Sequence, residues 1–130
     1  MKNWSGHIIF DQEFQWSALE KAFPEIWAII TRDIKQNQED GNYDPLLLEL
    51  NLNEIRENKK PLGYIQEYAK YKLIFPIDRK EMIIYRGIPS EEIRSITEEV
   101  VKVLKNKRIK HTVDYDKMLL IEIKSKRRYG

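Results

Sequence analysis

The chain has 130 residues, 42% of them hydrophobic and 34% charged, which is enough apolar sequence for the core of one domain over residues 1–130. It contains no cysteine, which excludes disulfide bonds, cysteine-based zinc sites and thiol catalysis. No apolar run approaches the ~20 residues that a membrane-spanning helix needs, and the first residues do not match a signal peptide. We therefore expect a cytoplasmic protein with no membrane partner.

The charge is unevenly distributed along the chain. The net charge is only +2, but residues 102–130 contain ten Lys or Arg and three Asp or Glu, a net +7, whereas residues 1–101 carry a net −5. Such asymmetry predicts a basic surface for an anionic partner. A solvated helix end followed by a short basic tail over residues 124–130 explains the same charges, because charge runs are common on surfaces that bind nothing.

The N-terminal third is predicted to form a short strand and two helices. Residues 7–10 are an apolar run typical of a short strand. Ser17 and Glu20 match a capping box, so a helix is expected to begin there. Pro24 cannot lie deep in that helix, and we expect a break before it and a second helix that reaches Gln38. The second helix would bury Ile26, Trp27, Ile30 and Ile34.

Two segments in the middle of the chain have less decisive patterns. Residues 46–52 place leucine at every second position, which favours a strand, although leucine is a good helix former and Asp44-Pro45 makes a sound helix start. We predict a strand. Residues 62–70 are predicted to form a short helix because three tyrosines fall at helical spacing, which is typical of half-buried core and, alternatively, of a surface that stacks on bases. The tyrosines are Tyr64, Tyr68 and Tyr71.

Residues 71–125 have the clearest pattern, which reads strand, turn, strand, helix, strand, turn, strand. Gly87-Ile88-Pro89 is expected to end the second strand, and Ser90 is expected to cap the helix that follows. The helix has one apolar stripe, typical of core packing, that contains Ile93, Ile96, Val100, Val103 and Leu104. The strands are expected at residues 73–77, 82–85, 109–115 and 118–124.

Together these elements predict an α+β fold. We expect a mostly antiparallel sheet of about five or six strands, with two or three helices packed largely on one side. The helix that follows Ser90 would lie across one face of the sheet. Val100 on that helix and Ile121 on the last strand are therefore expected to be buried in the same core.

Few motifs of known chemistry are present. The sequence has no Gly-rich phosphate loop, and its two histidines, His7 and His111, have no neighbour at metal-ligand spacing. One pattern remains near the C-terminus, where two acidic residues precede an apolar strand that ends in Glu-x-Lys. Its residues are Asp114, Asp116, Glu122 and Lys124.

This pattern resembles the metal-binding hairpin of the PD-(D/E)xK nucleases. In a strand, Glu122 and Lys124 point to the same face. The resemblance implies that Asp114 or Asp116 joins Glu122 in holding Mg²⁺, and that Lys124 stabilises charge at the scissile phosphate. Alternating charge on the wet face of a half-buried hairpin explains the same residues, and in that interpretation the chain has no catalytic residue, no metal and no cofactor.

The basic residues of the last third fall into two clusters. The first comes where the helix passes into a strand, and the second ends the neighbouring strand. Because the start of one strand lies beside the end of its antiparallel partner, both clusters are expected at one end of the sheet, where they would neutralise several phosphates. They contain Lys105, Lys107, Arg108, Lys110, Lys124, Lys126, Arg127 and Arg128.

Three functions are compatible with these patterns. The preferred one is a small non-enzymatic binding or regulatory module whose basic C-terminal third contacts nucleic acid or an acidic protein. The second is a metal-dependent nuclease that uses the Glu-x-Lys hairpin and Mg²⁺. The third is a protein-binding inhibitor or immunity-type protein whose acidic N-terminal surface meets a basic target.

Overall fold

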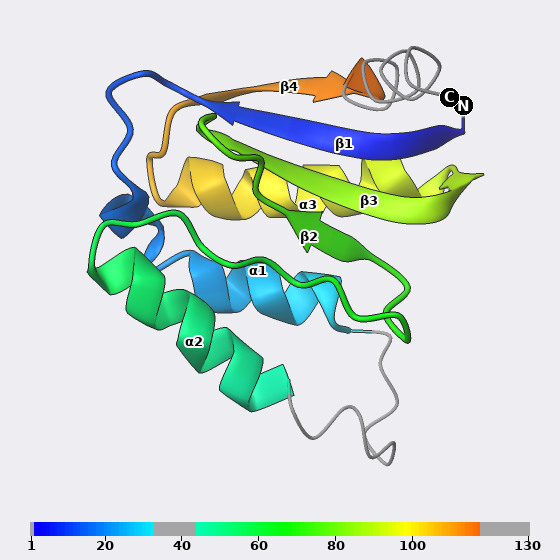
Figure 1. Cartoon of the computed structure of the whole chain (residues 1–130). Helices are drawn as coiled ribbons and strands as arrows, with labels where there is room; N and C mark the ends of the chain where they lie inside the picture. The colour runs from blue at the N-terminus through cyan, green and yellow to red at the C-terminus, as the bar shows by residue number, and fades with distance from the viewer. Residues whose placement is uncertain (1, 33–43, 118–130) are drawn as a thin grey trace, which may run out of the picture.

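The structure, a computed structural model, describes residues 2–32 and 44–117 (Figure 1). Four strands, three α-helices and one short 3₁₀ helix lie in these two ranges. In chain order they are β1 (Asn3–Phe10), η1 (Trp16–Leu19), α1 (Phe23–Ile30), α2 (Asp44–Arg56), β2 (Lys72–Ile74), β3 (Glu81–Ser90), α3 (Glu92–Asn106) and β4 (His111–Tyr115).

The four strands form one antiparallel sheet in the order β2-β3-β1-β4, so β1 is an inner strand that pairs on both sides. Helix α3 packs against β1 and β3, α1 packs against α3, and α2 packs against η1 and α1 (Figure 1). The predicted α+β class and antiparallel sheet are therefore confirmed. The described residues form four strands, fewer than the five or six predicted, and the strand expected at 118–124 lies outside them.

The core lies between the sheet and the helices, and the closest approach is at Gly6 in β1. An ideal Cβ at Gly6 would lie 2.0 Å from Oγ1 of Thr97 on α3, so only a residue without a side chain lets the helix cross here. Ile8 and Ile84 flank this crossing on the same face of the sheet and are completely buried. The position of α3 on the sheet is therefore fixed at β1.

The strand predicted at residues 46–52 is wrong, because these residues lie within helix α2. Leu52 is buried, together with Ile55 one turn later, whereas Leu46 and Leu50 are exposed. The run contains no β-branched residue that would favour a strand, and leucine has high helix propensity. Helix propensity and the Asp-Pro start therefore outweigh the period of two.

The short helix predicted at residues 62–70 is also wrong. Tyr64 instead pairs with Leu73, with backbone hydrogen bonds of 2.8 and 2.9 Å between them. The loop before Tyr64 turns at Gly63, where φ is +93°, and the side chain of Asn51 on α2 bonds to both the N–H and the carbonyl of Gly63. Tyr64 and Tyr71 are buried, so these two rings cannot stack on an incoming base.

The ends of several elements differ from the sequence predictions. The helix expected from Ser17 is a single 3₁₀ turn without a side-chain cap, because Asn58 and Arg56 engage Ser17 and Glu20 instead. Pro24 lies in the first turn of α1 as predicted. The helix ends at Ile30, so Thr31 and Arg32, which were expected to continue it, form a turn, and residues 33–38, including Ile34, lie outside the described ranges. Strand β2 is shorter than the predicted 73–77.

The predicted break at Gly87-Ile88-Pro89 is wrong, since β3 continues to Ser90 through an irregularity in its pairing with β1. Such a bulge accommodates Gly and Pro inside a strand. The N-cap of α3 is Glu91 rather than the expected Ser90, but Oγ of Ser90 still accepts a hydrogen bond from the Glu92 N–H at 3.0 Å. One donor of the first turn of α3 is thereby satisfied.

The apolar stripe of α3 is confirmed as core. Val100 is completely buried within it, as are Ile93 and Leu104. Val100→Ala should lower the free energy of unfolding by about 1–3 kcal/mol, as expected for a large-to-small change in a packed core. Val113 on β4 is exposed, so Val113→Ala is the matched control and should cost less. Equal effects of the two changes in urea denaturation would contradict the packing of α3 on the sheet.

Glu92 connects the first turn of α3 to the loop before β2 and to strand β3. The Glu92 carboxylate accepts a hydrogen bond from the Tyr71 hydroxyl and ion-pairs with Lys70 at 2.9 Å and Arg86 at 3.3 Å. The pKa of Glu92 lies below its ordinary value, first because of the Tyr71 hydrogen bond and then because of Lys70. The positive end of the helix dipole also favours a carboxylate at this position.

Stability should therefore depend on pH through Glu92. A carboxyl whose pKa is lower in the folded state stabilises the fold above its unfolded pKa, and this contribution is lost as pH falls through the folded pKa. The difference in free energy of unfolding between wild type and Glu92→Gln should be largest at neutral pH and shrink on acidification. A difference that stays constant from about pH 7 to about pH 3, the range in which carboxyls titrate, would contradict this role.

Candidate functional site

The candidate site lies where β1 ends and β4 begins. Phe10, the last residue of β1, pairs with His111, the first residue of β4. The loop from β1 to η1 and the turn from α3 to β4 therefore meet at this end of the sheet. We call residues 105–110, which contain the first predicted basic cluster, the α3–β4 turn.

The α3–β4 turn ends the helix with a Schellman motif. The Ile109 N–H bonds to the Leu104 carbonyl and the Arg108 N–H bonds to the Lys105 carbonyl, each at 3.0 Å. Arg108 occupies the left-handed position of the motif, with φ +58°. Leu104 and Ile109 are both buried in the core, so the turn is anchored on either side of Arg108.

The cations of the α3–β4 turn are exposed, and most lack an acidic partner. Among the described residues, no carboxylate lies within ion-pair distance of Lys105, Arg108 or Lys110, and Lys107 reaches only Glu25, at 3.9 Å. Arg56 on α2, by contrast, bonds to both Glu20 and Glu49. The turn therefore carries positive charge that the described part of the protein does not neutralise.

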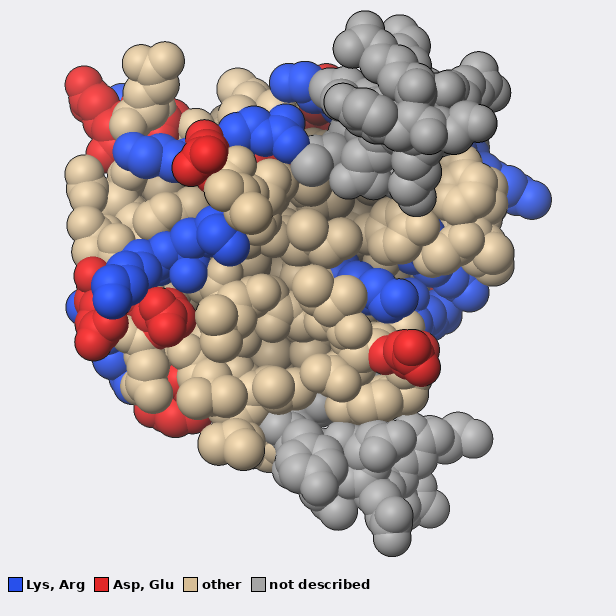
Figure 2. Space-filling view, viewed as in Figure 1, with Lys and Arg blue, Asp and Glu red and all other residues tan. Residues whose placement is uncertain are grey.

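Basic side chains do not form one continuous patch on the face shown in Figure 2. On the face shown in Figure 2, the centre is largely uncharged and basic and acidic side chains are interspersed around it. Long-range attraction of an anion to such a mixed face is weak, because the electric fields of neighbouring opposite charges partly cancel. On this face, attraction of an anionic partner depends on local contacts with individual basic residues.

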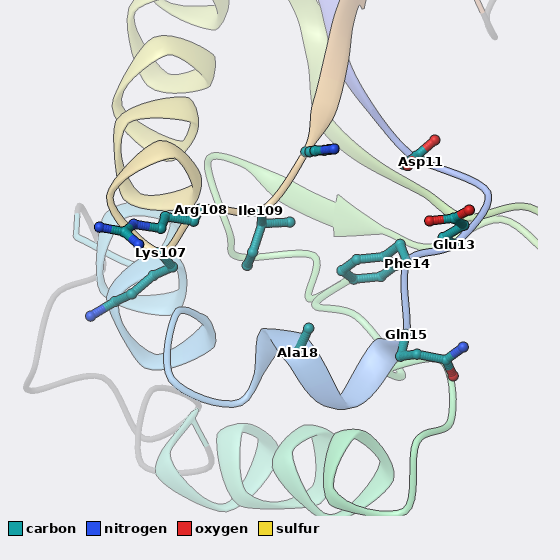
Figure 3. Close-up of a pocket in the computed structure, with 9 residues that line it drawn as sticks. Asp11, Glu13, Phe14, Gln15, Ala18, Lys107, Arg108 and Ile109 are labelled. Carbon is teal, nitrogen blue, oxygen red and sulfur yellow. The ribbon is translucent and has the colours of Figure 1, made fainter.

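A hollow of about 410 Å³ lies beside the turn. Its apolar lining comes from Phe14, Ala18 and Ile109, and Figure 3 shows Ile109 and Phe14 facing one another with Ala18 below them. Phe14 stacks on Phe10 with ring centroids 4.2 Å apart, which holds its ring in place. The apolar walls of the hollow are therefore rigid parts of the core edge.

Charges of opposite sign border the hollow on opposite sides. Lys107 and Arg108 extend at the end of α3, whereas Asp11 and Glu13 lie across from them on the loop after β1 (Figure 3). Lys110 also lines the hollow. A second hollow of about 340 Å³ shares Asp11 and Lys110 and is further lined by Ile9, Phe10, Gln12, His111 and Thr112.

The second predicted basic cluster, which contains Lys124, Lys126, Arg127 and Arg128, lies outside the described residues. The merging of the two clusters at one end of the sheet therefore stays a prediction. The first cluster lies where α3 passes into β4, beside the last residues of β1. The loop residues Asp11, Glu13 and Phe14 were missed, because only the pairing of β1 with β4 brings them to the basic turn.

Of the predicted nuclease residues, Asp114 and Asp116 are described, whereas Glu122 and Lys124 lie outside the described residues. The Asp116 carboxylate accepts hydrogen bonds from Asn3 Nδ2 at 2.9 Å and from the backbone N–H groups of Trp4 and Ser5. It clamps the start of β1 to the end of β4. Asp114 is exposed, and its Oδ1 accepts from the next backbone N–H. The nuclease function therefore stays a prediction.

A buried polar network on the other face of β1 was missed by sequence reasoning. Ser5 Oγ lies 2.7 Å from Nε2 of His7, and Nδ1 of His7 lies 3.0 Å from Oε2 of Glu81 on β3. These are the distances of a nucleophile, base and carboxylate relay. However, Ser5 and His7 are 0% exposed, so a substrate cannot reach Ser5 Oγ in this arrangement. The network satisfies buried polar groups and joins β1 to β3.

No family model, curated protein or solved structure matches this chain. Within residues 2–32 and 44–117, no three His, Asp or Glu side chains are grouped as metal ligands would be. In the same ranges, no helix is both long and apolar enough to cross a bilayer. Function must therefore be inferred from the chemistry of the site itself.

The buried network should contribute strongly to stability. His7→Ala would leave the Ser5 hydroxyl and the Glu81 carboxylate buried without the ring between them, at a cost of about 3 kcal/mol or more. Replacing both His7 and Glu81 by leucine removes the charged and polar partners together and should cost less than His7→Ala alone. Chemical denaturation of the three proteins measures this, and a His7→Ala effect below about 0.5 kcal/mol, as for a surface change, would contradict it.

Proposed function

We propose that this protein is a non-enzymatic binding module that contacts the phosphate backbone of nucleic acid through the α3–β4 turn. The observation that carries the proposal is the set of exposed cations there without carboxylate partners among the described residues. Exposed cations that gather within one turn gain most from a partner that carries closely spaced negative charges, and a chain of phosphates is such a partner.

The backbone at Arg108 supports the same proposal. The other non-glycine residues with positive φ in the described ranges are Asn58, Asp78 and Asp116, which are residue types that tolerate this conformation. Arginine adopts a positive φ less readily than asparagine or aspartate, and glycine is the usual residue at this position of a Schellman motif. Backbone strain is often found at functional positions, and the positive φ of Arg108 supports a functional role for its side chain. The guanidinium of an arginine forms paired hydrogen bonds to a phosphate.

Recognition is expected to depend weakly on sequence. The cations lie on a helix end and a turn, and they contact phosphates rather than base edges in a groove. An acidic protein surface would meet the same cations. The apolar hollow beside the turn suits a partner that carries flat apolar groups next to its negative charges, as every nucleotide of a single strand does.

Binding to nucleic acid should weaken steeply with salt. Four phosphate contacts to a single strand imply that affinity falls roughly fiftyfold between about 50 and about 200 mM salt, through counterion release. Fluorescence anisotropy with labelled single-stranded oligonucleotides, and with poly-glutamate as an acidic polypeptide, measures this. Binding of poly-glutamate without binding of oligonucleotides would overturn nucleic acid as the partner, and absence of binding to either would overturn the proposal.

Arg108→Gly separates binding from folding. Glycine relieves the left-handed strain, so the variant should be about 1 kcal/mol more stable than wild type, yet its affinity for oligonucleotides should fall and its salt dependence should become shallower. The matched control is Lys2→Glu combined with Lys72→Glu, at the far end of β1 and on the opposite edge strand β2, and it should bind better than Arg108→Glu combined with Lys110→Glu. Equal loss from both pairs would indicate a non-specific charge effect.

A further inference from the structure

The hollow beside the α3–β4 turn combines features that suit one part of a nucleotide each. Resting on the function proposed above, we propose that this hollow holds an unstacked base of single-stranded nucleic acid while the turn holds the adjoining phosphates. The hollow of about 410 Å³ falls in the range of small-ligand sites in proteins. The partner would then be a single strand rather than a duplex, whose bases are stacked and paired.

The apolar lining matches the faces of a base. Ile109 and Phe14 face one another across the hollow, and Ala18 on η1 leaves the space below them open (Figure 3). Phe14 is fixed by its stacking on Phe10 and by the edge of Trp16, whose ring centroid is 5.3 Å away. Phe14 and Ile109 are each 8% exposed and Ala18 is exposed, so a base that enters contacts the rims of Phe14 and Ile109 and the open surface of Ala18, and little side-chain ordering is needed on binding.

The carboxylates across from the cations match the edge of a base. Glu13 is exposed and has no hydrogen-bond partner among the described residues, and Asp11 uses Oδ1 to accept from the Gln12 N–H. Free carboxylate oxygens accept hydrogen bonds from base amino groups, such as N4 of cytosine. Asp11 and Glu13 also repel the second phosphate chain of a duplex. Both effects, hydrogen bonding to an unpaired base and repulsion of a second strand, favour a single strand.

The adjoining second hollow offers room for a neighbouring nucleotide. It shares Asp11 and Lys110 with the first and is bordered by His111. Nδ1 of His111 donates to the Ile109 carbonyl at 2.8 Å, which orients the ring at the border of this hollow. The two hollows therefore adjoin one another beside the basic turn, with room for two successive nucleotides.

The test compares oligonucleotides of about 12 nucleotides, a length within common single-strand site sizes, that carry cytosine, thymine or no base. Oligo(dC) should bind roughly tenfold more tightly than the abasic strand, as one stacked base would provide, and more tightly than oligo(dT), because thymine lacks an amino group. Duplex of the same length should bind more weakly than oligo(dC).

Two variants locate the base. Ala18→Leu fills the hollow without changing a charge, so it should lower affinity for oligo(dC) to that for the abasic strand and leave abasic binding and its salt dependence intact. Ala28→Leu, on the exposed face of α1, is the matched control and should change neither. Glu13→Gln should narrow the preference for oligo(dC) over oligo(dT).

The outcomes distinguish the two proposals. If the abasic strand binds as tightly as oligo(dC), or the duplex binds more tightly than the single strand, the base site is overturned and phosphate binding by the turn stands. The same conclusion follows if Ala18→Leu binds oligo(dC) like wild type. If no strand binds at about 50 mM salt, where phosphate contacts are strong, the proposed function itself fails.

Discussion

The close crossing of α3 over β1 at Gly6 is the constraint on which the other parts depend. A side chain at Gly6 would overlap Thr97, so the helix and the strand hold each other at a distance that no larger residue permits. Because β1 pairs with both β3 and β4, the crossing positions three of the four strands relative to the helix. It also fixes where α3 ends, and hence where the α3–β4 turn meets the loop after β1.

The two faces of β1 perform different tasks. Ile8 and Phe10 lie on the face that packs under the helices, whereas Ser5 and His7 lie on the other face with Glu81. A slip of one residue in register would exchange these faces, placing a histidine in the apolar core. The buried network therefore makes the register of β1 against β3 specific, and the separate pairing of β1 with β4 places Phe10 beside His111 at the candidate site.

Sequence patterns predicted what depends on neighbours along the chain. The apolar stripe of α3 and the place of Pro24 follow from helical spacing and from the geometry of proline. The basic turn was expected beside the end of a strand at 118–124, which lies outside the described residues, and its position beside the end of β1 was not predicted. The strand expected at residues 46–52 is wrong, because leucine at every second position also fits a helix, and the helix propensity of leucine together with the Asp44-Pro45 start favours α2. The hollow could not be predicted, because Phe14 and Ile109 are brought together only by the order of strands in the sheet.

Arg108 shows how the fold tolerates a residue that local preference disfavours. A left-handed arginine is unfavourable by itself, but the hydrogen bonds of Ile109 and Arg108 back to the helix, together with buried Leu104, hold the turn in place. The same anchoring leaves the guanidinium at the surface, on a backbone that cannot relax away from the hollow. The core residues around the turn hold Arg108 in its strained conformation and so place its charge at the rim of the apolar hollow. A ligand with a charged group next to a flat apolar group needs this arrangement.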